Sequence, residues 1–130
     1  MITTPSITKT VEFNKLKTDS HEMAALLRLM RQEAITTQHP KTVVFYIYGD
    51  RYNILFGESF YLSEDIQFVG ETSFTGNVTG NPAVTFLPSG SPNSGGTVML
   101  GNRYDDIMYI IVNPVEGRVR VSNEPPDHWY

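Results

Sequence analysis

Histidine, serine and paired carboxylates are the side chains through which this sequence could do chemistry, because it contains no cysteine. Its three histidines, His21, His39 and His128, are far apart along the chain. None stands at the spacing from a second histidine or a carboxylate that a zinc site uses. We therefore interpret all three as ordinary surface or half-buried residues.

The sequence also contains no motif for a nucleophilic serine or for a calcium-binding loop. Ser89, Ser91 and Ser94 lie in a proline- and glycine-rich segment that lacks a G-x-S-x-G motif and a following lysine-bearing helix. The acidic pairs Glu64-Asp65 and Asp105-Asp106 offer oxygen ligands, but no calcium-loop motif surrounds them, so we predict solvated turn charges. The sequence thus predicts no enzyme, no metal, no cofactor and no small-molecule substrate.

The run Gly117-Arg118-Val119-Arg120 allows two interpretations. On a strand, Arg118 and Arg120 point to one face, where their planar guanidinium groups suit phosphates or carboxylates. The alternative is a strand whose valines face the core and whose arginines face solvent, near Glu116 or Glu124. The spacing alone favours this second interpretation.

The first element that positions these residues is a helix predicted over Pro5–Gln38. Proline suits the first turn of a helix, and His39-Pro40 ends it. A helical stripe runs along it with steps of three and four residues. Its members are Leu16, Ser20, Met23, Leu27, Met30 and Ala34, extended backwards by Ile7 and Val11.

The rest of the chain is predicted to be β-rich, with β-branched and aromatic runs separated by Gly, Pro, Asn and Asp. The expected strands are 41–48, 51–56, 60–62, 66–69, 83–87, 97–100, 107–112 and 118–121, with loops at 71–82 and 88–96 and an irregular tail from 122 to 130. One long helix followed by hairpin-connected strands is an α+β pattern, with the helix packed on an antiparallel sheet. We expect residues 1–40 and residues 41–130 to form one structural domain.

Composition and charge narrow the class of protein. The 130 residues are 40% hydrophobic and 18% charged, which is typical of a folded globular domain. Residues 1–40 carry five Lys or Arg against four Asp or Glu, whereas residues 41–130 carry five against ten. An acidic head is not the usual surface of a nucleic-acid coat. No apolar run approaches the ~20 residues that span a bilayer, and no signal peptide is visible. This leaves a cytosolic domain, or a chain that begins downstream of a removed membrane segment with Met1 as an added start.

Two segments resemble the GspH/FimT type of minor pilins and pseudopilins. Pro5-Ser6-Ile7 is similar to the point where a pilin helix leaves the membrane, and 23–45 is similar to the family's passage from helix to strand, with Arg31-Gln32-Glu33-Ala34 in its "R-x-E-A" form. The second segment follows the family's C-terminal order of motifs, at 84–90, 96–100, 107–112 and 117–121. The hydrophobic "F-T-L-I-E" start of such proteins is absent from this sequence.

The resemblance implies a non-enzymatic subunit of a type IV pilus, a type II secretion system or a competence pseudopilus, which contributes to filament assembly or initiation. Its partners would be other pilin or pseudopilin subunits, with Ile7, Val11 and Leu16 packing against them. Residues 1–40 would be the C-terminal half of an N-terminal helix that anchors the chain in the inner membrane. The head would lie outside the cytoplasm or in an extracellular pilus.

Some FimT-like members bind DNA during natural transformation, and they share the G-R-x-R strand. The alternative function is therefore a DNA-binding minor pilin, with Arg103, Arg118 and Arg120 as the phosphate contacts.

Overall fold

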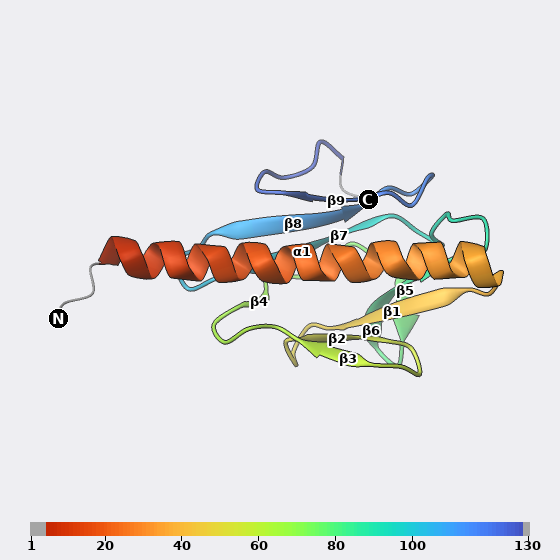
Figure 1. Ribbon diagram of the computed structural model, residues 1–130, viewed down its shortest axis with the longest axis horizontal. Coiled ribbons are helices and arrows are strands. Elements are labelled where there is room, and N and C mark those ends of the chain that lie inside the picture. Colours follow the sequence, from red (N-terminus) through yellow and green to blue (C-terminus); the bar gives the residue numbers. More distant parts are fainter. Residues whose placement is uncertain (1–4, 129–130) are drawn as a thin grey trace.

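A computed structural model of the chain describes residues 5–128 and places one long helix across two small sheets (Figure 1). The helix α1 spans Pro5–Thr37, in agreement with the sequence prediction. It ends where Gln38 takes a left-handed conformation with φ of 58° and its side-chain amide donates to the Ile35 carbonyl at 2.7 Å. Met1–Thr4, interpreted above as an added start, lie outside the described residues. Within those residues, no helix is both long and apolar enough to cross a membrane.

The β-rich part forms two antiparallel sheets rather than the single sheet that the sequence predicts. Sheet A has the strand order β3-β2-β1-β6-β5, and sheet B has the order β4-β7-β8-β9. The strands of sheet A are β1 (Lys41–Tyr46), β2 (Arg51–Ile54), β3 (Ser59–Tyr61), β5 (Gly76–Val78) and β6 (Asn81–Phe86). The strands of sheet B are β4 (Gln67–Phe68), β7 (Gly96–Gly101), β8 (Ile107–Val112) and β9 (Val119–Ser122).

The prediction of a loop over 71–82 is wrong in its second half, where β5 and the start of β6 form a hairpin. Thr79 and Gly80 connect the two strands with φ values of 49° and 90°, the pair of positive angles that a tight hairpin turn needs. The strand was missed because its residues are polar and glycine-bearing, which is more typical of loops. The tail has no regular structure from Asn123 to His128, as predicted, and Trp129 and Tyr130 lie outside the described residues.

The core lies between α1 and the inner faces of both sheets. Every residue of the predicted stripe from Leu16 to Ala34 is buried, so the helical spacing identified the packed face. The two sheets meet through aromatic rings: Phe45 of β1 stacks on Phe74 with centroids 5.4 Å apart and contacts Phe68 of β4 edge-on at 6.4 Å. Burial of this shared cluster holds the helix and both sheets in one unit.

Asp19 fastens α1 to the segment that follows β3. Its carboxylate is almost fully buried and accepts two hydrogen bonds from Ser63, one from the backbone N–H at 2.7 Å and one from the hydroxyl at 2.8 Å. A buried carboxylate is tolerated because such charge-assisted hydrogen bonds offset its lost hydration. The predicted helical stripe did not include Asp19, because acidic residues are rarely buried in a core.

Candidate interaction surface

The two arginines singled out on the last strand lie side by side and are exposed. Arg118 and Arg120 alternate with Val119, which is buried, and Val121, which packs against the core. Arg118 pairs with Glu116 through Nε and Oε2 at 3.1 Å, with 81% and 58% of the two side chains exposed. An ion pair this open contributes little stability. Together with Asn113 and Glu116, the two arginines border a hollow of about 330 Å³.

Arg103 lies at the far end of β8 and does not join them. It belongs to the β7–β8 turn, where Arg103 lies 5.2 Å and Lys9 lies 5.8 Å from the centre of the Tyr104 ring. Near the other end of α1, Arg28 contacts Val119 of β9. Residues 9 and 28 of one helix are about 28 Å apart at 1.5 Å per residue. The structure therefore brings together two of the three proposed DNA contacts.

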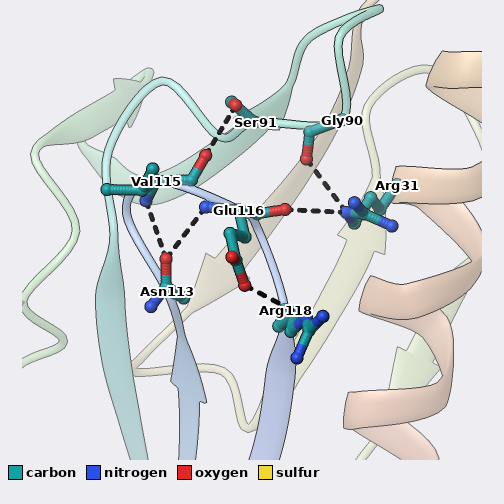
Figure 2. Close-up of polar contacts among 7 residues, drawn as sticks. All are labelled: Arg31, Gly90, Ser91, Asn113, Val115, Glu116 and Arg118. Atoms are coloured by element: carbon teal, nitrogen blue, oxygen red, sulfur yellow. Dashed lines mark hydrogen bonds and ion pairs between the residues drawn. The ribbon is translucent and has the colours of Figure 1, made fainter.

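The turn before β9 is held in place by Arg31 of α1 (Figure 2). The Arg31 Nε–H donates to two backbone carbonyls, those of Gly90 and Glu116, each at 3.0 Å. These carbonyls belong to the β6–β7 loop and the β8–β9 turn, which are joined again by the bond from the Ser91 hydroxyl to the Val115 carbonyl at 2.7 Å. One helix side chain thus fixes two loops that are far apart in the sequence.

Glycine is needed at position 117 for this arrangement. Gly117 has φ of 75°, and a Cβ there would lie 2.3 Å from the Gly90 carbonyl oxygen and 3.2 Å from Arg31 Nε. A second helix arginine, Arg28, donates from Nη2 to the Val119 carbonyl at 2.8 Å. Neither arginine belongs to the helical stripe that the sequence predicts. The signal that could have identified Arg31 was its place in the "R-x-E-A" form.

The predicted packing residues of α1 separate into two groups. Leu16 is 0% exposed and belongs to the chain's own core, whereas Ile7 and Val11 are 53% and 49% exposed. The predicted extension of the packed stripe back to Ile7 and Val11 is therefore wrong, because Val11 lies about 140° around the helix from Leu16. Leu29, which sequence reasoning did not single out, is 51% exposed. It follows Val11 by 18 residues, about five helical turns, so the two lie in line on the outward face. Ala25 follows Ile7 by the same interval and is also exposed. We call Ile7, Val11, Ala25 and Leu29 the outward stripe.

The histidines and loop serines take no part in a common site. His21, His39 and His128 are all exposed, and each loop serine takes part in a hydrogen bond that stabilises its loop. Within residues 5–128, no group of three or more His, Asp or Glu side chains is close enough to hold a metal ion. The acidic pairs include Asp65 and Asp105, which adopt positive φ in tight turns.

Arg31, Gly90 and Gly117 lie close together in the structure. All three belong to the segments on which the family resemblance rests. A comparison with protein families matches residues 19–123 to type II transport protein GspH. The chain belongs to the GspH family. This membership confirms the expectation of a structural protein rather than an enzyme. No curated protein sequence matches the chain closely enough to count as a relative.

Solved structures of two other proteins are similar to this fold. The minor pseudopilin EpsH from the type 2 secretion system of Vibrio cholerae is similar with a TM-score of 0.68 at 16% identity, over 83% of this chain and 96% of that one. The type IV minor pilin FimU of Pseudomonas aeruginosa is similar with a TM-score of 0.63 at 15% identity, over 93% of this chain and 99% of that one. The predicted α+β fold class, a long helix packed on antiparallel β structure, is confirmed.

Proposed function

We propose that this chain is a minor subunit of a cell-envelope filament of the type II secretion or type IV pilus kind. The observation that carries the proposal is the outward stripe, whose Ile7, Val11 and Leu29 are about half exposed along one face of α1. Figure 1 shows the first turns of this helix running beyond the sheets. Apolar side chains in a line on an uncovered helix are typical of a surface that packs against another subunit. Membership of the GspH family supports the same role.

The proposal extends to the membrane. In this role α1 continues from an upstream apolar helix that anchors the chain in the inner membrane, and the head lies outside the cytoplasm or in the filament. The upstream coding sequence tests this directly. A short basic leader ending in Gly, followed by about 20 apolar residues with a Glu near their start, supports the anchor. An upstream sequence with no apolar segment contradicts it.

Cross-linking in the native envelope tests the packing surface, because the chain has no cysteine of its own. Val11→Cys and Leu29→Cys are expected to cross-link to other filament subunits with a short thiol–amine reagent. Thr75→Cys, exposed and directly before β5 rather than on α1, is the control and is expected to give no such products. Equal labelling of all three variants, with filament subunits absent from every product, would count against the proposal.

DNA binding is the second candidate function, and the exposed pair Arg118 and Arg120 beside the hollow supports it. Glu116 opposes it, because its carboxylate already pairs with Arg118 and repels phosphate. A titration with duplex DNA at several salt concentrations decides the matter. If the strand binds phosphates, Arg120→Ala weakens binding, Glu116→Gln strengthens it, and affinity falls as salt rises. Binding that Arg120→Ala leaves unchanged, or no binding at low salt, ends this candidate.

A further inference from the structure

The strand β3 forms one edge of sheet A, and its outer side is free to pair (Figure 1). The Leu62 N–H donates to the Asp50 carbonyl at 3.0 Å, so the backbone groups of Leu62 point toward β2. Bonded positions alternate along an antiparallel pair, so Phe60 also faces β2, whereas Ser59 and Tyr61 direct their backbone groups to the free edge. This edge therefore offers the N–H and the carbonyl of both residues to another strand.

The edge of sheet B at β9 is closed in a way that the edge at β3 is not. The Arg118 carbonyl accepts a hydrogen bond from the residue after β8 at 2.9 Å, so Val119 directs its backbone groups to the free edge. Arg28 caps this edge, because its Nη2 donates to the Val119 carbonyl at 2.8 Å. Proteins block edge strands in this manner, since an open edge pairs with other chains. Within the part of the chain that the structure describes, no side chain caps Ser59 or Tyr61.

A largely apolar hollow lies between β3 and α1. Its volume is about 480 Å³, and it is lined by Phe60 of β3 and by Glu22, Ala25, Leu26 and Leu29 of the helix. A strand added at the free edge places the side chain opposite Phe60 about 5 Å from it, on the face that borders the hollow. An apolar side chain at that position fills the hollow, as side-chain pockets do beside other sheet edges that bind peptides.

The charges beside the hollow favour a basic neighbour for that apolar side chain. Glu58 lies two residues before Phe60, so their side chains point to the same face of the sheet. Glu58 and Glu22 are both exposed, and neither takes part in an ion pair among the described residues. On the opposite face, Tyr61 is 72% exposed, and an added strand covers its ring.

We propose that the free edge of β3 binds an extended peptide segment of a partner protein by strand addition. The segment carries a basic residue and an apolar residue two positions apart, opposite Glu58 and Phe60. Backbone hydrogen bonds to Ser59 and Tyr61 supply affinity, whereas the hollow and the carboxylates supply specificity. The inference goes beyond the proposed function, because it adds a partner at the edge of sheet A.

A synthetic peptide, acetyl-TKTLTKT-amide, tests the edge on the purified chain. Lysine stands two positions from leucine on both sides, so either strand direction places a lysine opposite Glu58. In an amide NMR titration, the peptide is expected to shift the signals of Ser59 and Tyr61. A copy with N-methyl groups on the two threonines beside leucine cannot donate to the edge, and it is expected to bind at least about tenfold more weakly. A copy with glutamate in place of lysine is also expected to bind several-fold more weakly.

Variants of the chain identify the residues that bind. Ser59→Pro removes an N–H that faces the free edge and keeps the pairing with β2, so it is expected to weaken binding at least about tenfold. Circular dichroism confirms that this variant is folded, and the N-methylated peptide decides the matter if it is not. Glu58→Lys is expected to shift the preference several-fold toward the glutamate peptide. Glu71→Lys, at an exposed residue beyond β4, is the control and is expected to leave the preference unchanged.

Two results overturn the inference. The first is that acetyl-TKTLTKT-amide binds no more tightly than its N-methylated copy, or shifts signals only outside β3 and the hollow. The second is that the chain alone forms dimers that Ser59→Pro disperses, because a second copy would then occupy the edge. Either result leaves the cross-linking of Val11→Cys to other filament subunits untouched, so failure here differs from failure of the proposed function.

Discussion

Sheet A meets the helix at Asp19, whose carboxylate accepts two hydrogen bonds from Ser63, whereas sheet B meets it at Arg28 and Arg31, whose guanidinium groups donate to backbone carbonyls. Asp19 and Arg28 are nine residues apart, about two and a half helical turns, so they lie on opposite sides of α1. The same helix is therefore fastened by an acceptor on one side and by donors on the other.

This difference teaches that the loops packed on α1 decide which helix side chains can fasten them. The loop after β3 presents a backbone N–H and a hydroxyl to the helix, and the loops before β9 present carbonyls. Buried polar groups need partners of complementary type, so one side of the helix requires an acceptor and the other requires donors.

The largest expected effect comes from blocking the close approach at sheet B. Gly117→Ala places a Cβ against the Gly90 carbonyl, at a residue with φ of 75°, and is expected to destabilise the chain by about 2–4 kcal/mol in urea unfolding. Gly80→Ala is the matched control, with φ of 90° and nothing within 4 Å, and is expected to cost only about 1 kcal/mol. Equal losses of stability would show that backbone strain, and not the close contact with the Gly90 carbonyl, makes glycine necessary at position 117.

The next effect tests the anchor of sheet A. Asp19→Ala leaves the backbone N–H of Ser63 without its acceptor and is expected to lower the free energy of unfolding by about 2–3 kcal/mol. Asp19→Asn keeps one side-chain oxygen as the acceptor for the Ser63 N–H, and its amide group can donate a hydrogen bond to the Ser63 hydroxyl. We therefore expect this variant to recover more than half of the stability that Asp19→Ala loses. Glu64→Ala, which is exposed, is the control and is expected to change stability by less than about 0.5 kcal/mol. If Asp19→Asn is as damaging as Asp19→Ala, charge rather than hydrogen bonding holds this sheet.

A smaller loss is expected from the corresponding anchor of sheet B. Arg31→Lys keeps the charge but removes the Nε–H that reaches the carbonyls of Gly90 and Glu116, and is expected to cost about 1–2 kcal/mol. Arg120→Lys changes an exposed residue of the same type and is expected to stay within about 0.5 kcal/mol. Thermal unfolding of the two variants side by side measures the difference. Indistinguishable midpoints would mean that positive charge alone fixes the loops.

The smallest effect at neutral pH concerns Tyr52 of sheet A. Burial raises the pKa of the Tyr52 hydroxyl well above its usual value, and the nearby carboxylates of Glu22 and Asp19 raise it further. A group whose pKa is raised on folding contributes stability below its unfolded pKa of about 10 and loses it as the pH rises above that value. Stability is therefore expected to fall between about pH 9 and about pH 12, and Tyr52→Phe is expected to flatten that fall. Tyr61→Phe, at an exposed tyrosine, serves as the control, and an equal flattening there would contradict the assignment to Tyr52.

Much of the fold could be predicted from residue spacing, because a helix and a strand each repeat with a fixed period. The stripe from Leu16 to Ala34 is buried as expected, and the strand at 107–112 has the predicted bounds. The division into two sheets could not be predicted, since the pattern of a strand does not say which neighbour it pairs with. The hairpin at β5 was missed for a related reason: its polar residues are held by the turn at Thr79-Gly80 and by pairing with β6.

The candidate surface was predicted in part. The exposed Arg118 and Arg120 on one face follow from strand alternation. The extension of the helical stripe back to Ile7 and Val11 is wrong, because both residues are about half exposed and lie in line with Leu29. Arg103 lies elsewhere because the β7–β8 turn takes it to the opposite end of β8. Leu16 follows Val11 by five residues, about 140° around the helix, so Leu16 faces the sheets whereas Val11 faces outward.

By itself, the sequence determined the elements of this protein: a long helix with one apolar face, strands with alternating residues, and no constellation for catalysis. These are local properties, set by the periods of the backbone and the chemistry of single side chains. Tertiary structure alone decided that Arg31 meets Gly90 and Gly117 and that Asp19 meets Ser63. These contacts join residues distant in the chain, so they exist only after packing has fixed both sheets against the helix.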